Sequence, residues 1–215
     1  MIRIAALALA LALSLTPGAA PAQPADRAGV FDYQVLALSW SPSWCATTGR
    51  AGEAAQCDPA RRTGFVVHGL WPQYERGWPA DCDTAERDPS RRESQAMADI
   101  MGSGGLAWHQ WRKHGRCSGL SAAGYYRTVR AAAGGVRIPP VLAMLPRDVR
   151  LDAAVIEDAF IDVNPRLTRD AITVTCDDGR LDEVRICLTR AMDPRACAPD
   201  IRRDCGARML VEAPG

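Results

Sequence analysis

Lysine is nearly absent from this sequence of 215 residues. Among 26 basic residues only Lys113 is a lysine, and the others are arginines. Acidic residues number 25, so the formal net charge at neutral pH is +1. No global positive field therefore marks the chain as a polyanion binder, and any such site must be local. Because arginine supplies charge elsewhere, position 113 is predicted to need a compact ammonium rather than a planar guanidinium.

Long hydrophobic runs are also missing. The longest, residues 4–15, falls short of the roughly 20 residues that span a bilayer. It follows a positive start at Arg3 and precedes a Thr-Pro-Gly break and the small residues Ala20 and Ala22. This pattern predicts a secretory signal peptide over 1–22. The remaining residues, 23–215, are expected to form one periplasmic or secreted domain that is monomeric and not associated with a membrane.

No Cys-x-x-Cys pair occurs, and the cysteine spacings fit no zinc module. In an oxidising compartment an even number of cysteines predicts disulfides. The eight are Cys45, Cys57, Cys82, Cys117, Cys176, Cys187, Cys197 and Cys205. Sequence alone leaves about 105 pairings open, although locality favours Cys45 with Cys57 and pairing within the last four.

Apolar residues make up 47% of the chain and charged residues 24%, which is typical of a globular protein. Alternating patterns predict strands at 31–40, 171–176 and 181–188, a β-branched apolar run predicts a central strand at 63–71, and a short final strand is expected at 209–212. Helical patterns cover 90–101, 106–116, 121–133 and 151–163, with loops at 41–63 and 73–89. Ser90 and Glu93 form a capping-box pattern, and 177–180 is a hairpin signal. The expected fold class is α+β, with a central antiparallel sheet flanked by helices.

The three histidines occupy two short segments. His68 ends the second predicted strand, and His109 and His114 lie on the second predicted helix. At about 100° per residue, one helix face carries His109, Gln110, Lys113 and His114. Trp108 and Trp111 point the other way and are expected to pack in the core.

Several kinds of catalytic site do not fit. The two helical histidines are five residues apart rather than the four of a His-Glu-x-x-His zinc motif, and Lys113 would repel a cation. No Gly-x-Ser-x-Gly elbow occurs, and a cysteine nucleophile fails if every cysteine is bridged. Two histidines and a lysine suit attack of a ribose 2′-hydroxyl on the adjacent phosphodiester, with one imidazole as base and one as acid. Such a reaction would cut RNA and spare DNA.

Two segments carry a family resemblance. Residues 65–72, Phe-Val-Val-His-Gly-Leu-Trp-Pro, and 108–117, Trp-His-Gln-Trp-Arg-Lys-His-Gly-Arg-Cys, resemble the two signature regions of the ribonuclease T2 family. The resemblance implies an α+β fold and an endoribonuclease that uses no metal or cofactor. It also implies cleavage of single-stranded RNA with little base specificity. The products would be 2′,3′-cyclic phosphates and then 3′-phosphates.

Carried over by position, the resemblance makes His114 the general base and His68 the general acid. It implies that His109 contacts phosphate and that Lys113 steadies the phosphorane. Gln110 departs from the family pattern, which usually has Glu here. A neutral amide cannot shuttle a proton, so the alternative is a weakened relative that binds RNA or a protein. A third reading is a metal-dependent secreted hydrolase.

The resemblance also concerns substrate binding and disulfides. Trp71 matches an aromatic residue that stacks on a base, although packing against the core is the alternative. Tyr74 and Trp78, in the following loop, could stack on bases or pack against the loop. The implied disulfides are Cys45–Cys57, Cys82–Cys117, Cys176–Cys205 and Cys187–Cys197.

Overall fold

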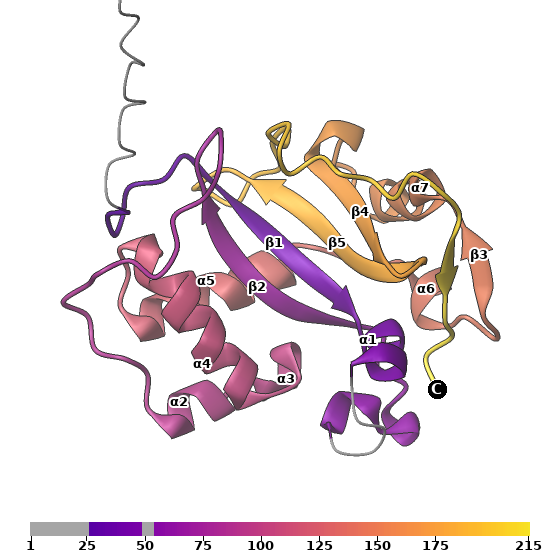
Figure 1. Ribbon diagram of the computed structural model, residues 1–215, viewed down its shortest axis with the longest axis horizontal. Helices are drawn as coiled ribbons and strands as arrows, with labels where there is room; N and C mark the ends of the chain where they lie inside the picture. Colours follow the sequence, from indigo (N-terminus) through magenta and orange to yellow (C-terminus); the bar gives the residue numbers. More distant parts are fainter. Residues whose placement is uncertain (1–25, 49–53) are drawn as a thin grey trace, which may run out of the picture.

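A six-stranded sheet runs through the molecule (Figure 1). The computed structural model describes residues 26–48 and 54–215, so the predicted signal peptide at 1–22 lies outside the described residues. The strands are β1 (Tyr33–Trp40), β2 (Phe65–Gln73), β3 (Val149–Leu151), β4 (Ile172–Asp177), β5 (Arg180–Leu188) and β6 (Met209–Val211). Their order is β2-β1-β5-β6-β3, with β4 also paired to β5. All pairs are antiparallel except β5 with β6, and the predicted α+β class is confirmed.

Helices flank this sheet. They are α1 (Ser41–Thr47), α2 (Arg91–Gln95), α3 (Ala98–Met101), α4 (Gly104–Lys113), α5 (Ala122–Gly134), α6 (Pro140–Ala143) and α7 (Ala153–Val163). Short 3-10 turns cover Ala55–Cys57, Pro59–Arg61, Gly115–Ser118 and Arg169–Ala171. Helices α2 to α5 gather beside β2, and α6 and α7 lie toward β3 and β4 (Figure 1). No helix in the described part of the chain combines the length and the apolar character needed to cross a membrane.

Alternation along the strands separates two apolar clusters. Leu36 and Leu38 of β1 enter the large core with Trp111 of α4 and Phe160 of α7. Val35 points the other way, into a smaller cluster with Cys187, Cys197 and Ile201. Because successive side chains of a strand face opposite sides, Ser39 lies on the face of this smaller cluster.

Four disulfides bridge all eight cysteines, in the pairs that the resemblance implies. They join Cys45 to Cys57, Cys82 to Cys117, Cys176 to Cys205 and Cys187 to Cys197. Removing a native bridge typically costs about 2–5 kcal/mol. The Cys82–Cys117 bridge fixes the loop after β2 to the turn that follows α4.

Some predicted boundaries were wrong. The loop expected at 41–63 contains α1, because Pro42 occupies its first turn, where a missing N–H costs nothing. The helix expected at 90–101 begins with the predicted Ser90–Glu93 capping box but breaks into α2 and α3. The break places both Met97 and Met101 in the core. The helix expected from residue 151 starts at Ala153, since Leu151 belongs to β3, and neither β3 nor α6 was predicted.

Candidate active site

A β-bulge directs His68 away from the core. In the pairing of β2 with β1, Ala37 faces Gly69 and Leu38 faces Val67, so His68 is an extra, unpaired residue. Val67 therefore reaches the large core, as Leu70 does, although the two are three residues apart. His68 lies on the opposite face with its ring half-exposed. Bulges commonly re-aim a side chain in this way.

Glu183 of β5 contacts His68 across the sheet. A carboxylate oxygen of Glu183 lies within hydrogen-bond distance of His68 Nδ1. The other carboxylate oxygen accepts a hydrogen bond from Arg185 Nε at 2.8 Å and forms an ion pair with a terminal nitrogen of the same guanidinium at 2.7 Å. Ser39 Oγ of β1 donates to the oxygen that faces His68, at 3.4 Å. Ser39, His68 and Glu183 come from the neighbouring strands β1, β2 and β5 and lie on the same face of the sheet.

This carboxylate is held in its charged form. Burial alone raises the pKa of Glu183, whose exposed fraction is 3%. The hydrogen bond and charge of His68, with the charge of Arg185, outweigh burial and leave the pKa below its usual range. Glu183 therefore accepts the Nδ1 proton of His68 and leaves Nε2 as the second ring nitrogen that can exchange protons.

The second histidine lies where α4 ends. α4 begins after the cap Ser103 and ends at Lys113, so the expected helix over 106–116 stops earlier. His114 is the C-cap, with φ −122° and ψ −42°, and its N–H donates to the Gln110 carbonyl at 2.9 Å. Gly115 follows, and a Cβ there would lie 2.6 Å from Trp111 and 2.8 Å from Tyr125. The chain thus turns tightly against the core directly after His114.

His114 lies in a buried and positively charged environment. Its exposed fraction is 7%, and Nδ1 has no hydrogen-bond partner among the described residues. Burial, followed by the charges of Lys113, His68 and His109, lowers its pKa to about 3. The imidazole is consequently neutral at physiological pH, which is the state that a general base requires.

The ring of Trp71 packs against both His68 and His114. Its ring centroid lies 5.3 Å from that of His68 and 5.4 Å from that of His114. The indole Nε1 donates to Gln110 Oε1 at 2.8 Å. A Cβ on Gly69 would come within 2.3 Å of both atoms of this hydrogen bond, so Gly69 makes room for it. Half-buried Trp71 also packs against the smaller cluster, which places it at the centre of the site.

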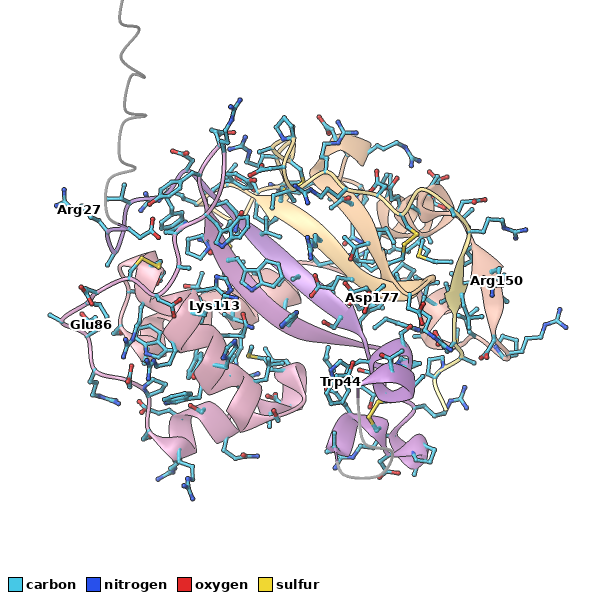
Figure 2. The ribbon with its side chains drawn as sticks, viewed as in Figure 1. Arg27, Trp44, Glu86, Lys113, Arg150 and Asp177 are labelled. Atoms are coloured by element: carbon cyan, nitrogen blue, oxygen red, sulfur yellow. A yellow bond between two sulfur atoms is a disulfide. The ribbon has the colours of Figure 1, made fainter. Side chains whose placement is uncertain are left out.

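The predicted helix face divides into buried and exposed residues. Gln110 and His114 are buried, whereas His109 and Lys113 are exposed. Figure 2 shows Lys113 at the end of α4 that approaches β2. His109 and Lys113 lie close enough to His114 to lower its pKa. The structure thus brings all five predicted catalytic residues to one region.

One prediction about this helix was wrong. Trp111 is fully buried, but Trp108 is 41% exposed and does not belong to the core. The guanidinium of Arg112 lies 5.1 Å from its ring centroid instead. Trp108 lies on the outer side of α4 because the core cluster takes only Ala107 and Trp111 from the middle of this helix.

The loop after β2 separates its two aromatic residues. The hydroxyl of Tyr74 donates to Asp26 at 3.3 Å, so Tyr74 packs toward the N-terminal segment. Trp78 is 52% exposed, which leaves its ring accessible to a stacking partner.

A groove of about 450 Å³ adjoins His68, and Ser39, Trp44 and Leu106 are among its lining residues.

Glu183 and Arg185 lie at this site but were not predicted from the sequence. A signal for them exists, because two charged residues separated by one position share a face of the strand predicted at 181–188. What the sequence lacks is the strand order that sets β5 beside β1 and near His68. At this site and throughout the described part of the chain, no group of three or more His, Cys, Asp or Glu side chains converges as metal ligands would.

Comparisons with known proteins agree with this fold. Solved structures that superpose on it include an RNase-related protein from Calystegia sepium, with a TM-score of 0.64 and 21% identity. The match covers 86% of this chain and 97% of that one. RNase NT, solved in complex with 5′-AMP, has a TM-score of 0.62 and 22% identity, and the match covers 86% and 98% of the two chains.

The sequence comparison gives the family. A ribonuclease from Aeromonas hydrophila is 48% identical over 99 residues, which is 46% of this chain and 43% of that protein. The matched segments thus span less than half of the length of such curated relatives. Residues 31–197 match the Ribonuclease T2 family, and the chain belongs to this family.

Proposed function

We propose that this protein is an endoribonuclease that cleaves single-stranded RNA by transphosphorylation. The observation that carries the proposal is the contrast between two imidazoles that contact one indole ring. His114 is buried, with a pKa lowered to about 3, and His68 shares a hydrogen bond with an anionic carboxylate. Two titratable groups whose environments favour opposite protonation states suit a base and an acid.

The proposed reaction has two coupled proton transfers. Neutral His114 takes the proton of the ribose 2′-hydroxyl while the 2′-oxygen forms a bond to phosphorus. Protonated His68 gives its Nε2 proton to the 5′-oxygen as the bond from that oxygen to phosphorus breaks. The products are a 2′,3′-cyclic phosphate and a free 5′-hydroxyl. Water then opens the cyclic ester to a 3′-phosphate, with the two histidines exchanging roles.

The exposed cations of the site have electrostatic roles in this proposal. Negative charge grows on the phosphoryl oxygens in the transition state, and a fixed cation stabilises it where it develops. Lys113 supplies that charge, and His109 contacts the phosphate. The same phosphate offsets the positive charges around His114, so its pKa rises when RNA binds. A base that is unprotonated in the free enzyme thereby becomes a stronger acceptor in the complex.

Three aromatic residues are proposed to bind bases. Trp71 is fixed by its hydrogen bond to Gln110, so its ring can support a base without losing rotamer freedom. Exposed Trp78 is a second stacking surface. Tyr74 is weaker, because its hydroxyl is engaged with Asp26. Stacking on rings of this kind tolerates any base, which supports low base specificity.

We also propose that the protein is exported as a monomer, with cleavage after Ala22. The four disulfides support an oxidising compartment. N-terminal sequencing of the exported protein tests the cleavage position. A mature chain that begins elsewhere would contradict it.

The test of the reaction uses the oxidised protein with RNA, a matched DNA oligonucleotide and EDTA. The expected result is cleavage of RNA in EDTA, with cyclic phosphate ends detected by mass spectrometry, and intact DNA. Loss of cleavage in EDTA and its return with zinc would favour a metal-dependent hydrolase. RNA binding without cleavage would favour the non-enzymatic alternative, which the neutral Gln110 supports.

A further inference from the structure

We infer that Glu183 is a positioning residue for His68, and this inference rests on the proposed function. The carboxylate of Glu183 binds the Nδ1 proton of the ring, keeps Nε2 turned toward the substrate and stabilises the imidazolium form. Glu183 itself touches no RNA, because 3% of its surface is exposed. It acts through the histidine.

The contacts of the Glu183 carboxylate support a role at His68. Its two oxygens have different partners, since one faces His68 and Ser39 and the other binds Arg185. Arg185 thus neutralises part of the buried charge without reaching the oxygen that serves His68. A structural ion pair would need only the Glu183–Arg185 bond, which already joins two residues of one strand. The additional contact to β2 is made with the one β2 side chain that the bulge turns to this face.

Arg185 also connects Glu183 to Trp71. Its guanidinium carbon lies 5.4 Å from the ring centroid of Trp71, on which a base is proposed to stack. Glu183, Arg185, His68 and Trp71 therefore form one connected network. Substitution of Glu183 should therefore affect the protonation and position of the His68 ring more than the position of Trp71.

Several titratable or charged groups surround the Glu183–His68 pair. Within the described residues these are Arg185 on β5, and His114, His109 and Lys113 from α4 and its end. Asp182, the neighbour of Glu183, is bonded to Thr175. β1 contributes only the neutral Ser39. Among these residues Glu183 is thus the one anion in contact with His68, and its removal should make the imidazolium less stable.

The central experiment compares kcat against pH for the wild type and Glu183→Gln on one dinucleotide. Gln keeps the shape and an acceptor oxygen but removes the charge. We expect kcat to fall about tenfold at neutral pH. We also expect the alkaline limb, where the general acid loses its proton, to move about one unit to lower pH. A uniform fall at every pH with no shift of this limb would overturn the inference, because a merely structural loss acts in that way.

Two further variants distinguish the effect of the Glu183 charge from the effects of the Arg185 charge and of side-chain length. Glu183→Gln leaves the Arg185 cation unpaired, and this cation could itself disfavour a protonated His68. The double variant Glu183→Gln/Arg185→Met removes both charges, and the shift of the limb should persist. Its disappearance would assign the effect to Arg185 instead. Glu183→Asp keeps the charge with a shorter reach, so it should lower kcat while the limb stays closer to its wild-type pH.

A matched control comes from another buried ion pair. Glu212 binds Ser43 at 2.7 Å and pairs with Arg180, and its exposed fraction is 8%. Glu212→Gln makes the same chemical change away from the histidines. It should lower stability without moving either limb of the pH profile. A limb shift of equal size in this control would contradict a specific role for Glu183.

A readout without catalysis keeps the inference testable if the proposed function fails. The protein has three histidines, so its imidazole proton signals can be followed individually by NMR during a pH titration. His68 should titrate at a lower pH in Glu183→Gln than in the wild type, whereas His109 should not change. An unchanged His68 titration would overturn the inference whether or not the protein cleaves RNA. Absence of wild-type cleavage with a shifted His68 would instead overturn only the proposed function.

Discussion

His68 lies on a strand, half-exposed, with a buried carboxylate at its Nδ1. His114 lies at the end of a helix, buried, and its Nδ1 has no partner among the described residues. Both contact the ring of Trp71. Residue type alone therefore does not set the protonation state of an imidazole. The surroundings set it, because a neighbouring anion favours the charged imidazole and burial beside basic groups favours the neutral one.

Removing either imidazole should have the largest effect on activity. His68→Ala and His114→Ala should each lower kcat by about 10²–10⁴-fold, the usual contribution of one positioned acid or base. The double variant should lose much less than the product of the two, because the residues act in one concerted step. Steady-state kinetics on a dinucleotide check this. Circular dichroism confirms that each variant is folded, and additive losses would contradict a shared step.

Lys113→Arg tests the charge beside His114. The planar guanidinium cannot occupy the position of a compact ammonium, so kcat should fall about tenfold although the charge is kept. The adjacent Arg112→Lys is the matched control, since Arg112 lies over Trp108 on the outer side of α4. It should leave kcat nearly unchanged. Equal rates for Lys113→Arg and the wild type would show that position 113 needs only charge.

Gln110→Glu should reduce the difference in environment between the two histidines. Glu can accept the hydrogen bond from Trp71 Nε1 as Gln110 does. Its negative charge would raise the pKa of His114 from about 3 toward neutrality. We expect turnover at neutral pH to rise about threefold, because the pKa of a base works best near the operating pH. The acid limb of kcat against pH should move to higher pH. Pairing with Lys113 and repulsion of phosphate oppose this gain, and a lower kcat at every pH would contradict our expectation.

The smallest effect concerns a buried acid far from the two histidines. Burial, with the charge of Asp204, raises the pKa of Glu157 to about 7 despite its bond to Arg169. Its folded-state pKa lies above the unfolded value, so the stability it contributes is present below about pH 4.5 and lost as pH rises to about 7. Glu157→Gln should therefore stabilise the protein at pH 8, by about 3 kcal/mol at most, and change little at pH 4.

Thermal unfolding at the two pH values measures this effect. Exposed Asp158, which also pairs with Arg169, gives the control Asp158→Asn. It should change stability by less than about 0.5 kcal/mol at both pH values. Neither variant should move the pH profile of catalysis, so a shift in Glu157→Gln would show that titration outside the site affects the histidines.

Local patterns in the sequence determined much of the fold. The Ser90–Glu93 capping box, the hairpin between β4 and β5, and the alternation of β1 depend on neighbouring residues only. The two signature segments likewise determined that His68 lies on a strand and that His109, Lys113 and His114 belong to one helix and its end. Each of these signals comes from contacts within one turn of helix or one strand pair, where sequence separation is short.

The features that distinguish the two histidines come from tertiary packing. The bulge at His68 depends on the register of β2 against β1, and the early end of α4 depends on Gly115 packing against Trp111 and Tyr125. Glu183 reaches His68 across 115 positions of sequence, and only the strand order brings them together. The spacing of residues in the sequence predicts which side chains share one face of a helix or strand. Burial and charge at an imidazole depend on several elements packed together, and these set its protonation state.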